Sequence, residues 1–206
     1  MARTLEFDYT AALERATLLF WENGYLGTSQ RDLLDTMEIG GGSFHNTFKS
    51  KKNAYLECLK HYNATVNRLR GEAFFSAPTG AEGVRALFRA VLDCLDNPNT
   101  PSPICLMAES ISQPVFAETE LRDYVQEQMS TLGRLMTARL RADKKAGLLP
   151  SEFEAETVVQ VILTYLQGVW RMALVSYNRK RFERQNELFL NSLGLEQPRR
   201  SSRRNA

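Results

Sequence analysis

Helical spacing of apolar residues is the feature that most constrains how this 206-residue chain can fold. Between Tyr9 and Phe20, apolar side chains recur at the spacing that places them on one face of a helix. Further stripes of this kind occupy four later segments: 51–75, 81–96, 117–146 and 151–177. No segment shows a convincing alternation of the kind that a half-buried strand requires. The sequence therefore predicts an all-α fold.

Capping residues mark where the N-terminal helices begin and end. Gly24 is placed to end the first helix, because glycine adopts the left-handed backbone of a helix C-terminus at little cost. Thr28 and Ser29 can cap the next helix, and Ser50 can cap the longer helix that follows. A short helix over about residues 41–47 is expected between these two. The N-terminal part is thus predicted to hold three helices.

Prolines and polar residues divide the second half of the chain. The segment Asn97–Pro103 contains three prolines in seven residues, which predicts a loop. A short apolar helix is expected directly after this loop, ended by Pro114. We expect Ser151 to start the next long helix and residues 179–193 to form the last one.

Composition and cysteine content exclude several classes of protein. The N-terminus has no apolar core of a secretory signal, and no apolar run approaches the roughly 20 residues that span a bilayer. The cysteines, Cys58, Cys94 and Cys105, are few and odd in number, which argues against a disulfide framework. We therefore expect reduced thiols in a cytoplasmic protein without a membrane partner. The net charge of +2 does not by itself indicate a nucleic-acid ligand.

The segment Glu38–Lys52, EIGGGSFHNTFKSKK, places three glycines beside short polar residues in an otherwise helical region. Two short helices joined by a turn would form a helix-turn-helix here, whose second helix enters the major groove of DNA. Glycines at the start of that helix would let its backbone come close to phosphates. Asn46 can read an adenine base with two hydrogen bonds. Phe44 and Phe48 are expected on the opposite face, packed against the rest of the domain.

Residues 20–51 resemble the DNA-binding region of the TetR family of transcriptional regulators. The matching features are the pattern FxxxGY that ends at Tyr25, then Thr28-Ser29, Gly42-Ser43-Phe44 and Ser50-Lys51. The rest of the chain agrees with the family in the number and length of its helices. The resemblance implies an N-terminal three-helix DNA-binding domain with a helix-turn-helix, followed by a larger helical ligand-binding and dimerisation domain. We expect the following boundaries: 1–49 for the first domain, 50–195 for the second, and 196–206 for a disordered basic tail.

The resemblance also implies which residues contact DNA. Thr28 would bind a phosphate at the start of the second helix, and Lys51 would bind a phosphate at the start of the fourth. Gly42 and Ser43 would lie where the recognition helix approaches DNA. The full set of candidate DNA-binding residues is Thr28, Ser29, Gln30, Gly41, Gly42, Ser43, His45, Asn46, Lys49 and Lys51.

Four positions depart from the family pattern. The family commonly has Gly at the position of Glu38, Ser or Thr at that of Gly40, Tyr at that of His45, and His or Tyr at that of Thr47. If residue 38 adopts a positive φ angle, a glutamate there costs roughly 1 kcal/mol relative to glycine. The sequence thus predicts local strain at Glu38.

Charge supports DNA binding through its placement. Residues 1–51 contain five Lys or Arg against seven Asp or Glu, so this part of the chain is net acidic. However, Lys49, Lys51 and Lys52 cluster at one helix start, with Arg31 nearby. Phosphate contacts need local cations rather than a basic total. A homodimer would double these contacts.

For the second domain, the resemblance implies an allosteric homodimer. The last two long helices would pair with their copies in a four-helix bundle. A small-molecule or electrophilic inducer would change the spacing of the two recognition helices and release double-stranded operator DNA. The candidate ligand-binding or sensing residues are Cys105, Met107, Phe116, Tyr165 and Trp170.

Cys105 has two interpretations. A buried cysteine is most simply a small hydrophobe. Some TetR-like proteins, however, carry a cysteine here in a stretch similar to GCLLVNxALE and respond to electrophiles or oxidants; Glu109 matches that pattern, whereas Ile104 replaces its glycine. A helix N-terminus also lowers the pKa of a thiol. We expect Cys105 to alkylate faster than Cys58 and Cys94, which lie on apolar stripes.

Two other classes of function compete with a regulator. An enzyme is disfavoured because the chain has two histidines, no HExxH or paired CxxC spacing, and no context for a Ser–His–acid triad. We therefore expect no catalytic residue, no metal and no cofactor. A helical small-molecule-binding module that kept the helix-turn-helix shape without binding DNA stays open, and salt-dependent binding to duplex DNA would separate it from a regulator.

Overall fold

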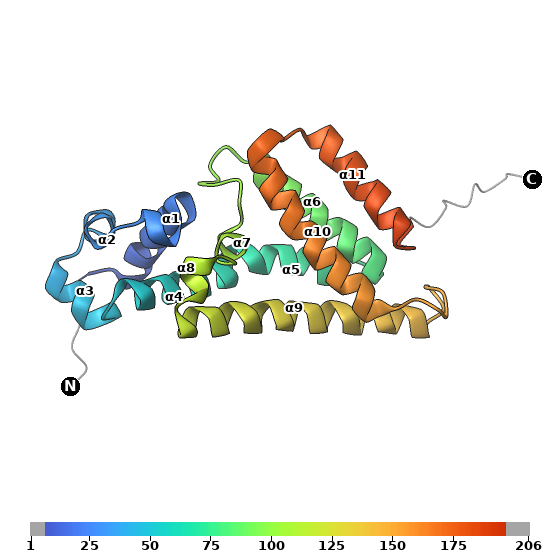
Figure 1. Cartoon of the computed structure of the whole chain (residues 1–206), viewed down its shortest axis with the longest axis horizontal. Helices are drawn as coiled ribbons and strands as arrows, with labels where there is room; N and C mark the ends of the chain where they lie inside the picture. Colours follow the sequence, from blue (N-terminus) through green and yellow to red (C-terminus); the bar gives the residue numbers. More distant parts are fainter. Residues whose placement is uncertain (1–6, 197–206) are drawn as a thin grey trace, which may run out of the picture.

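The computed structural model describes residues 7–196, and within that range it contains helices and no strand, as the all-α prediction requires. Three helices gather at one end of the molecule (Figure 1): α1 (Tyr9–Gly27), α2 (Gln30–Met37) and α3 (Gly41–Phe48). The predicted basic tail at 196–206 lies, except for Glu196, outside the described residues.

The structure confirms the predictions made for Gly24 and Ser29, whereas Thr28 does not cap α2. Gly24 has a φ angle of 72° and interrupts α1, although one more turn continues to Gly27. Ser29 caps α2 in a reciprocal pair of hydrogen bonds with Asp32. Glu38 ends α2 in the left-handed conformation, with a φ angle of 57°, so the condition under which a glutamate is strained at this position is met.

A continuous helical segment leads from the N-terminal helices into the middle of the molecule. Its parts are α4 (Lys51–Tyr62), a π-helical turn labelled η1 (Asn63–Asn67), and α5 (Arg68–Phe75). The sequence predicted one helix here, and the π turn was not predicted. Such turns occur frequently at functional sites, because they re-aim the side chains that follow.

The second half of the chain forms the larger helical body (Figure 1). Its elements are α6 (Gly80–Asp96), α7 (Leu106–Glu109), α8 (Gln113–Phe116), α9 (Thr119–Lys145), α10 (Ala155–Ser176) and α11 (Arg179–Ser192). The long helix α9 lies along one side and contacts α4, α6, α8 and α10. Pairs of neighbouring helices therefore enclose one connected hydrophobic core.

Two predicted boundaries are wrong. Pro114 lies in the first turn of α8 and does not end a helix, because the fixed φ of proline fits a first turn, where its missing N–H is not needed. Ser151 lies in a turn, and α10 begins only at Ala155.

Aromatic pairs join the N-terminal helices to α4. The ring of Phe20 meets that of Tyr55 edge to face at a centroid distance of 4.7 Å, and Trp21 meets Tyr62 in the same way at 4.9 Å. Such pairs contribute roughly 0.5–1.5 kcal/mol each beyond the burial of their area. They fasten α1, and with it the helix-turn-helix, to the helical segment that continues into the middle of the molecule.

Helix α10 is more apolar than expected from the sequence. It has 22 residues, and its most apolar window has a mean hydropathy of 1.4, so by length and composition alone it could cross a membrane. Its buried stripe, which includes Val159, Ile162 and Val169, belongs to the hydrophobic core. We attribute its apolar character to packing, because a core helix passes the same test.

Candidate DNA-binding surface and ligand cavity

Two phenylalanines hold α3 against the molecule. Phe44 and Phe48 are 1% and 2% exposed, as their spacing predicted. Phe48 also stacks on Tyr9 of α1 with ring centroids 5.7 Å apart. Since this face is packed inward, the opposite face of α3 is turned out.

Most of the candidate DNA-binding residues are exposed, on the outward face of α3 or at the start of α2. Seven of them are exposed: Ser29, Gln30, Gly41, Gly42, His45, Asn46 and Lys49. Ser43 and Lys51 are half-buried. A Cβ added at Gly42 would find nothing within 4 Å, so the chain itself does not require glycine there for space. A backbone without a side chain at this point lets another molecule approach closely.

Thr28 differs from the other candidates because it is fully buried. Its hydroxyl donates a hydrogen bond to the backbone carbonyl of Gly24 at 2.9 Å. In this conformation the side chain of Thr28 therefore does not reach a phosphate, and the exposed start of α2 is presented by Ser29 and Gln30 instead.

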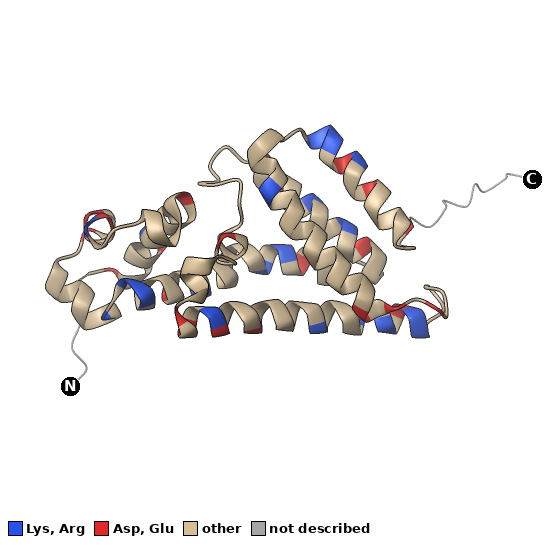
Figure 2. Cartoon of the chain, in the orientation of Figure 1, with Lys and Arg blue, Asp and Glu red and all other residues tan. Residues whose placement is uncertain are grey.

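Basic residues gather at the start of α4 (Figure 2), and the side chains of Lys51 and Lys52 each contact a neighbouring group. The ammonium group of Lys51 lies over the ring of Tyr25, 4.6 Å from its centroid. Partial burial lowers the pKa of Lys51 below its ordinary value. The ammonium group of Lys52 pairs with Glu120 of α9 at 2.9 Å, so this lysine is already neutralised within the chain.

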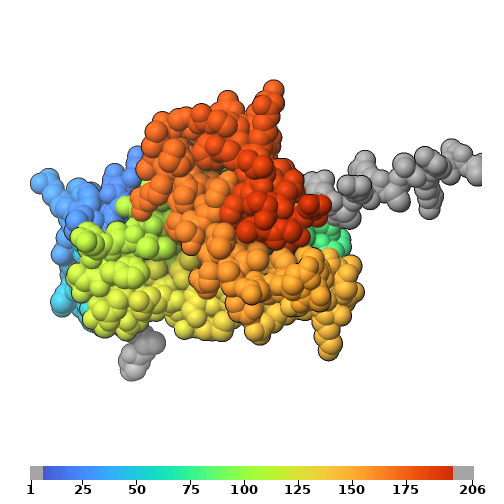
Figure 3. Space-filling view, turned by 45° about the vertical axis from the view of Figure 1, so that its right-hand side comes forward, coloured from blue at the N-terminus to red at the C-terminus, as the bar shows by residue number. Residues whose placement is uncertain are grey.

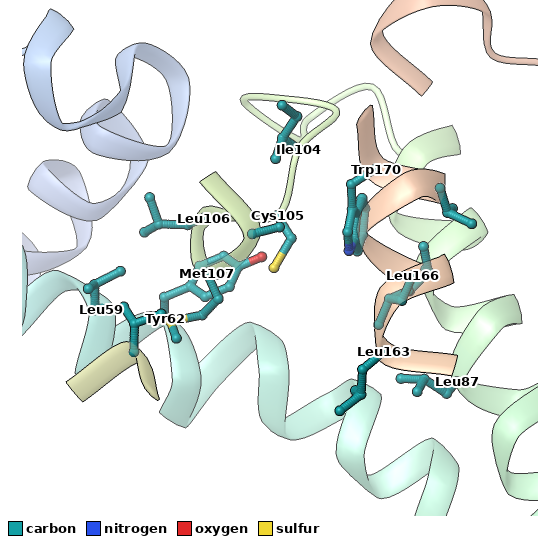
Figure 4. Packing of buried hydrophobic residues seen from close by; sticks show 14 of the residues in the cluster. Leu59, Tyr62, Leu87, Ile104, Cys105, Leu106, Met107, Leu163, Leu166 and Trp170 are labelled. Atoms are coloured by element: carbon teal, nitrogen blue, oxygen red, sulfur yellow. The ribbon is translucent and has the colours of Figure 1, made fainter. Parts of the chain in front are cut away.

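A cavity of ≈260 Å³ lies in the larger helical body, between α5, α6, α7, α9 and α10. Three of the predicted ligand-binding residues line it: Cys105, Met107 and Trp170. Figure 4 shows the sulfur of Cys105 beside the hydroxyl of Tyr62, with Trp170 facing them from α10.

Phe116 and Tyr165 do not line this cavity. Tyr165 stacks on Phe189 at a centroid distance of 3.8 Å, and its hydroxyl donates to the side chain of Asn186 at 3.1 Å. It therefore joins α10 to α11. Phe116 lies at the end of α8 and packs against the core.

Sequence reasoning missed Arg70, which is buried in the cavity wall. Its guanidinium donates hydrogen bonds to the hydroxyl of Tyr62 and to the side-chain oxygen of Asn67. The available signal was its place four residues before Phe74, on the buried stripe of α5, where a charged residue is unusual.

The three cysteines occupy different environments. Cys58 is fully buried, and burial raises the pKa of its thiol to about 12, in line with the expected shielding. Cys94, also expected to be shielded, is instead half-buried, and its sulfur accepts a hydrogen bond from Arg70 at 3.0 Å. Cys105 is the N-cap residue of α7, as predicted, but is only 6% exposed.

Helix α7 touches both parts of the molecule. The indole N–H of Trp21 in α1 donates to the backbone carbonyl of Ile104 at 2.6 Å. The hydroxyls of Tyr55 and Ser110 lie 2.8 Å apart. Glu109 pairs with Arg171 of α10 at 2.9 Å. The segment that contains Cys105 is thus bonded to α1, α4 and α10.

Metal chemistry has no candidate ligand set in residues 7–196, because no group of three or more His, Cys, Asp or Glu side chains is placed to hold an ion.

No family model matches the chain. The chain is 28% identical to YezE, an uncharacterized HTH-type transcriptional regulator of Bacillus subtilis (strain 168). The 166 aligned residues cover 81% of this chain and 84% of that protein. It is 21% identical over 164 residues to the HTH-type transcriptional repressor ComR of Escherichia coli (strain K12), over 79% and 78% of the two chains.

Among solved structures, the chain resembles the TetR family transcriptional regulator CifR, in a cysteine-substituted form complexed with 26-bp double-strand operator DNA. The TM-score is 0.83 with 29% identity, over 92% of this chain and 99% of that one. The similarity therefore spans both the helix-turn-helix end and the helical body with its cavity.

Proposed function

We propose that this chain, a DNA-binding transcriptional regulator similar in sequence and structure to TetR family regulators, acts as a homodimeric repressor that leaves its operator when an inducer occupies the cavity. The relatives support the first step directly, because CifR is described in complex with operator DNA and ComR as a repressor. The proposal assigns no catalysis and no cofactor to the chain, and it places the protein in the cytoplasm, where DNA is available.

The proposed DNA contacts follow from exposure. Helix α3 would enter the major groove with Gly41, Gly42, His45 and Asn46, which all face solvent. Lys49 and Lys51 would bind phosphates on either side of the turn before α4. The phosphate contact first assigned to Thr28 would pass to the exposed start of α2.

One observation carries the link between inducer and DNA. Cys105 and Met107 line the cavity, and the residue next to them, Ile104, accepts the hydrogen bond of Trp21 in α1. A molecule that moves α7 would therefore move α1, against which α2 packs. Arg70 of the cavity wall also belongs to the helical segment that starts at Lys51. Differential binding to two such arrangements shifts their populations.

An exposed apolar face supports the homodimer. On α10, Val161, Met172 and Val175 are exposed at helical spacing, and Leu188 of α11 is 74% exposed. Figure 3 shows α10 and α11 side by side on the surface. Apolar surface of this kind on a folded chain is typical of an interface. We propose that α10 and α11 pair with their copies in a four-helix bundle.

Binding to duplex DNA tests the central proposal. A duplex selected from a random library would be titrated with the full chain at several salt concentrations. We expect tight, salt-dependent binding of two chains per site. Binding that does not depend on salt, or one chain per duplex, would contradict it.

The dimer is tested by Val175→Asp, with Leu69→Asp as the matched control. Both residues are exposed and apolar, at 74% and 59%, but Leu69 lies on α5, away from the proposed interface. We expect Val175→Asp alone to give monomers in light scattering and to weaken operator binding. Equal behaviour of the two variants would show that α10 is not the interface.

The role of Cys105 is tested with a thiol-reactive electrophile, using the wild type, Cys105→Ser and Cys94→Ser. If Cys105 is the sensor, treatment releases DNA from the wild type and from Cys94→Ser, but not from Cys105→Ser. Equal release from all three excludes Cys105 as the switch. If none of the three proteins releases DNA, the inducer is a reversible small molecule and Cys105 is part of the cavity wall.

A further inference from the structure

A single positive charge is buried in the wall of the cavity. Arg70 is 7% exposed and lines the cavity from α5. Moving a charged group out of water is costly unless an opposite charge or several hydrogen bonds compensate it. The groups around this guanidinium therefore indicate what the cavity is built to hold.

All the hydrogen-bond acceptors around Arg70 are neutral groups. Nη1 donates to the hydroxyl of Tyr62 at 3.0 Å and to Oδ1 of Asn67 at 2.8 Å, and lies 3.5 Å from the sulfur of Cys105. Nη2 donates to the sulfur of Cys94 at 3.0 Å. Thiols are weak acceptors, so two of these four contacts compensate the charge poorly.

No carboxylate pairs with Arg70 within the part of the chain that the structure describes. Glu72, on the same helix, forms its ion pair with Arg68 on the outer side. The other compensation comes from the rings of Trp170 and Tyr62, whose centroids lie 5.0 and 5.9 Å from the guanidinium carbon. An aromatic ring stabilises a cation but carries no net charge.

Two donor groups next to the cavity are free. A guanidinium has five N–H groups, and within residues 7–196 the Nε of Arg70 makes no hydrogen bond, while Nη2 makes one. Nε and Nη2 share an edge of the guanidinium, and such an edge can bind a carboxylate through two parallel hydrogen bonds. The indole N–H of Trp170 also has no acceptor in this range.

The rest of the cavity is mainly apolar. Phe74, Leu87, Val91, Met107 and Leu166 contribute to its wall, and its volume is ≈260 Å³. This volume is at the lower end of ligand sites, which suits one aromatic ring or a short alkyl chain.

We propose that the cavity binds a small monocarboxylic acid, with its carboxylate on Arg70 and its apolar body against α6 and α10. This inference rests on the proposed function, since it names the chemical class of the inducer. A monovalent anion matches the single uncompensated cation. A doubly charged phosphate would need a second cation, and the other arginine at the cavity, Arg68, is already paired.

Matched acids and amides test the proposal on the full chain without DNA. The probes are 3-phenylpropionate and octanoate, each compared with its neutral amide by titration calorimetry at pH 7.5. We expect at least one of these acids to bind, and its amide to bind about 10- to 100-fold more weakly, because it loses a charge-assisted pair.

Two variants locate the carboxylate. Arg70→Met should lower the affinity for the acid by a similar factor and leave the affinity for the amide unchanged or higher. An unfolded protein does not give this result. Arg68→Met is the control, because it removes a neighbouring arginine whose charge is already paired, and it should leave the acid affinity unchanged.

Four results would overturn the proposal. In the first, the amides bind the wild type with the same affinity as the acids. In the second, the acids bind Arg70→Met with unchanged affinity, and in the third, both arginine variants lose the same acid affinity. In the fourth, neither acid binds at millimolar concentration. The wild-type comparison of acid with amide decides the matter even if Arg70→Met does not fold.

DNA release is measured separately, so that the two proposals can fail independently. An acid that binds through Arg70 without releasing DNA contradicts the repressor mechanism and leaves the cavity assignment intact. Release of DNA by neutral compounds alone contradicts the acid and leaves the repressor mechanism intact.

Discussion

The helix-turn-helix end and the larger helical body use glycine and charge in opposite ways. At Gly42 of α3 an added Cβ would meet nothing within 4 Å, whereas at Gly83 of α6 it would lie 2.6 Å from the backbone oxygen of Phe74. Lys51 is half-buried at the surface, while Arg70 is enclosed in the core. Gly42 and Lys51 therefore lie at the surface, whereas Gly83 and Arg70 are enclosed by other parts of the chain. Glycine therefore leaves α3 open at Gly42, whereas at Gly83 it lets α6 pack closely against α5.

The largest expected effect comes from filling the tight glycine. Gly83→Ala should lower the free energy of unfolding by about 3 kcal/mol, because the new Cβ meets backbone that cannot rotate away. Gly42→Ala is the matched variant, and we expect stability to stay the same or rise by about 0.5–1 kcal/mol while DNA affinity falls. Urea unfolding and DNA titration of both variants measure the contrast. Equal destabilisation by the two substitutions would show that Gly42 and Gly83 do not differ in packing.

The link between the two regions is tested by Trp21→Phe. This change keeps an aromatic ring against Tyr62 but leaves the buried carbonyl of Ile104 without its donor. We expect a loss of about 2 kcal/mol of stability. If the contact transmits the signal, the variant binds DNA normally and responds less to the inducer. A normal response with the same stability loss would make the contact structural only.

At the DNA-facing end, Lys51→Ala and Asn46→Ala should separate two kinds of contact. Lys51→Ala should weaken binding to all sequences alike and reduce the salt slope by about one per subunit. Asn46→Ala should instead change the preference at particular base pairs by about 1–3 kcal/mol. Binding assays on a set of single-base operator variants distinguish them. A uniform loss for Asn46→Ala would make its role positional.

The smallest expected effect is at Glu38. Its left-handed backbone favours glycine, so Glu38→Gly should stabilise the chain by up to about 1 kcal/mol. The exposed carboxylate lies 3.4 Å from Arg15, and the loss of that weak pair offsets part of the gain. Glu38→Ala is the control, since it removes the pair and keeps the strain. Glycine less stable than alanine at this position would show that strain is absent.

The sequence by itself determined most of the fold and the class of function. Helix caps, glycines and apolar stripes involve partners within about four residues, so their signals are local. Ser29, Ser50 and Gly24 were therefore correctly placed, the positive φ of Glu38 was anticipated, and the comparisons confirm the prediction of a DNA-binding regulator. The helix boundaries predicted at Pro114 and Ser151 were wrong, because each residue type occurs near both the ends and the starts of helices.

Only the tertiary structure decided which side chains meet in the cavity. The hydrogen bond from Trp21 to Ile104 joins residues 83 positions apart, and that from Arg70 to Cys105 joins residues 35 apart. Neither separation leaves a pattern in the sequence, since the packing of whole helices brings these groups together. For the same reason the sequence placed Tyr165 and Phe116 in the cavity, left Thr28 at the surface and gave Arg70 no role. A stripe shows that a side chain is buried, but the neighbouring helices determine what it is buried against.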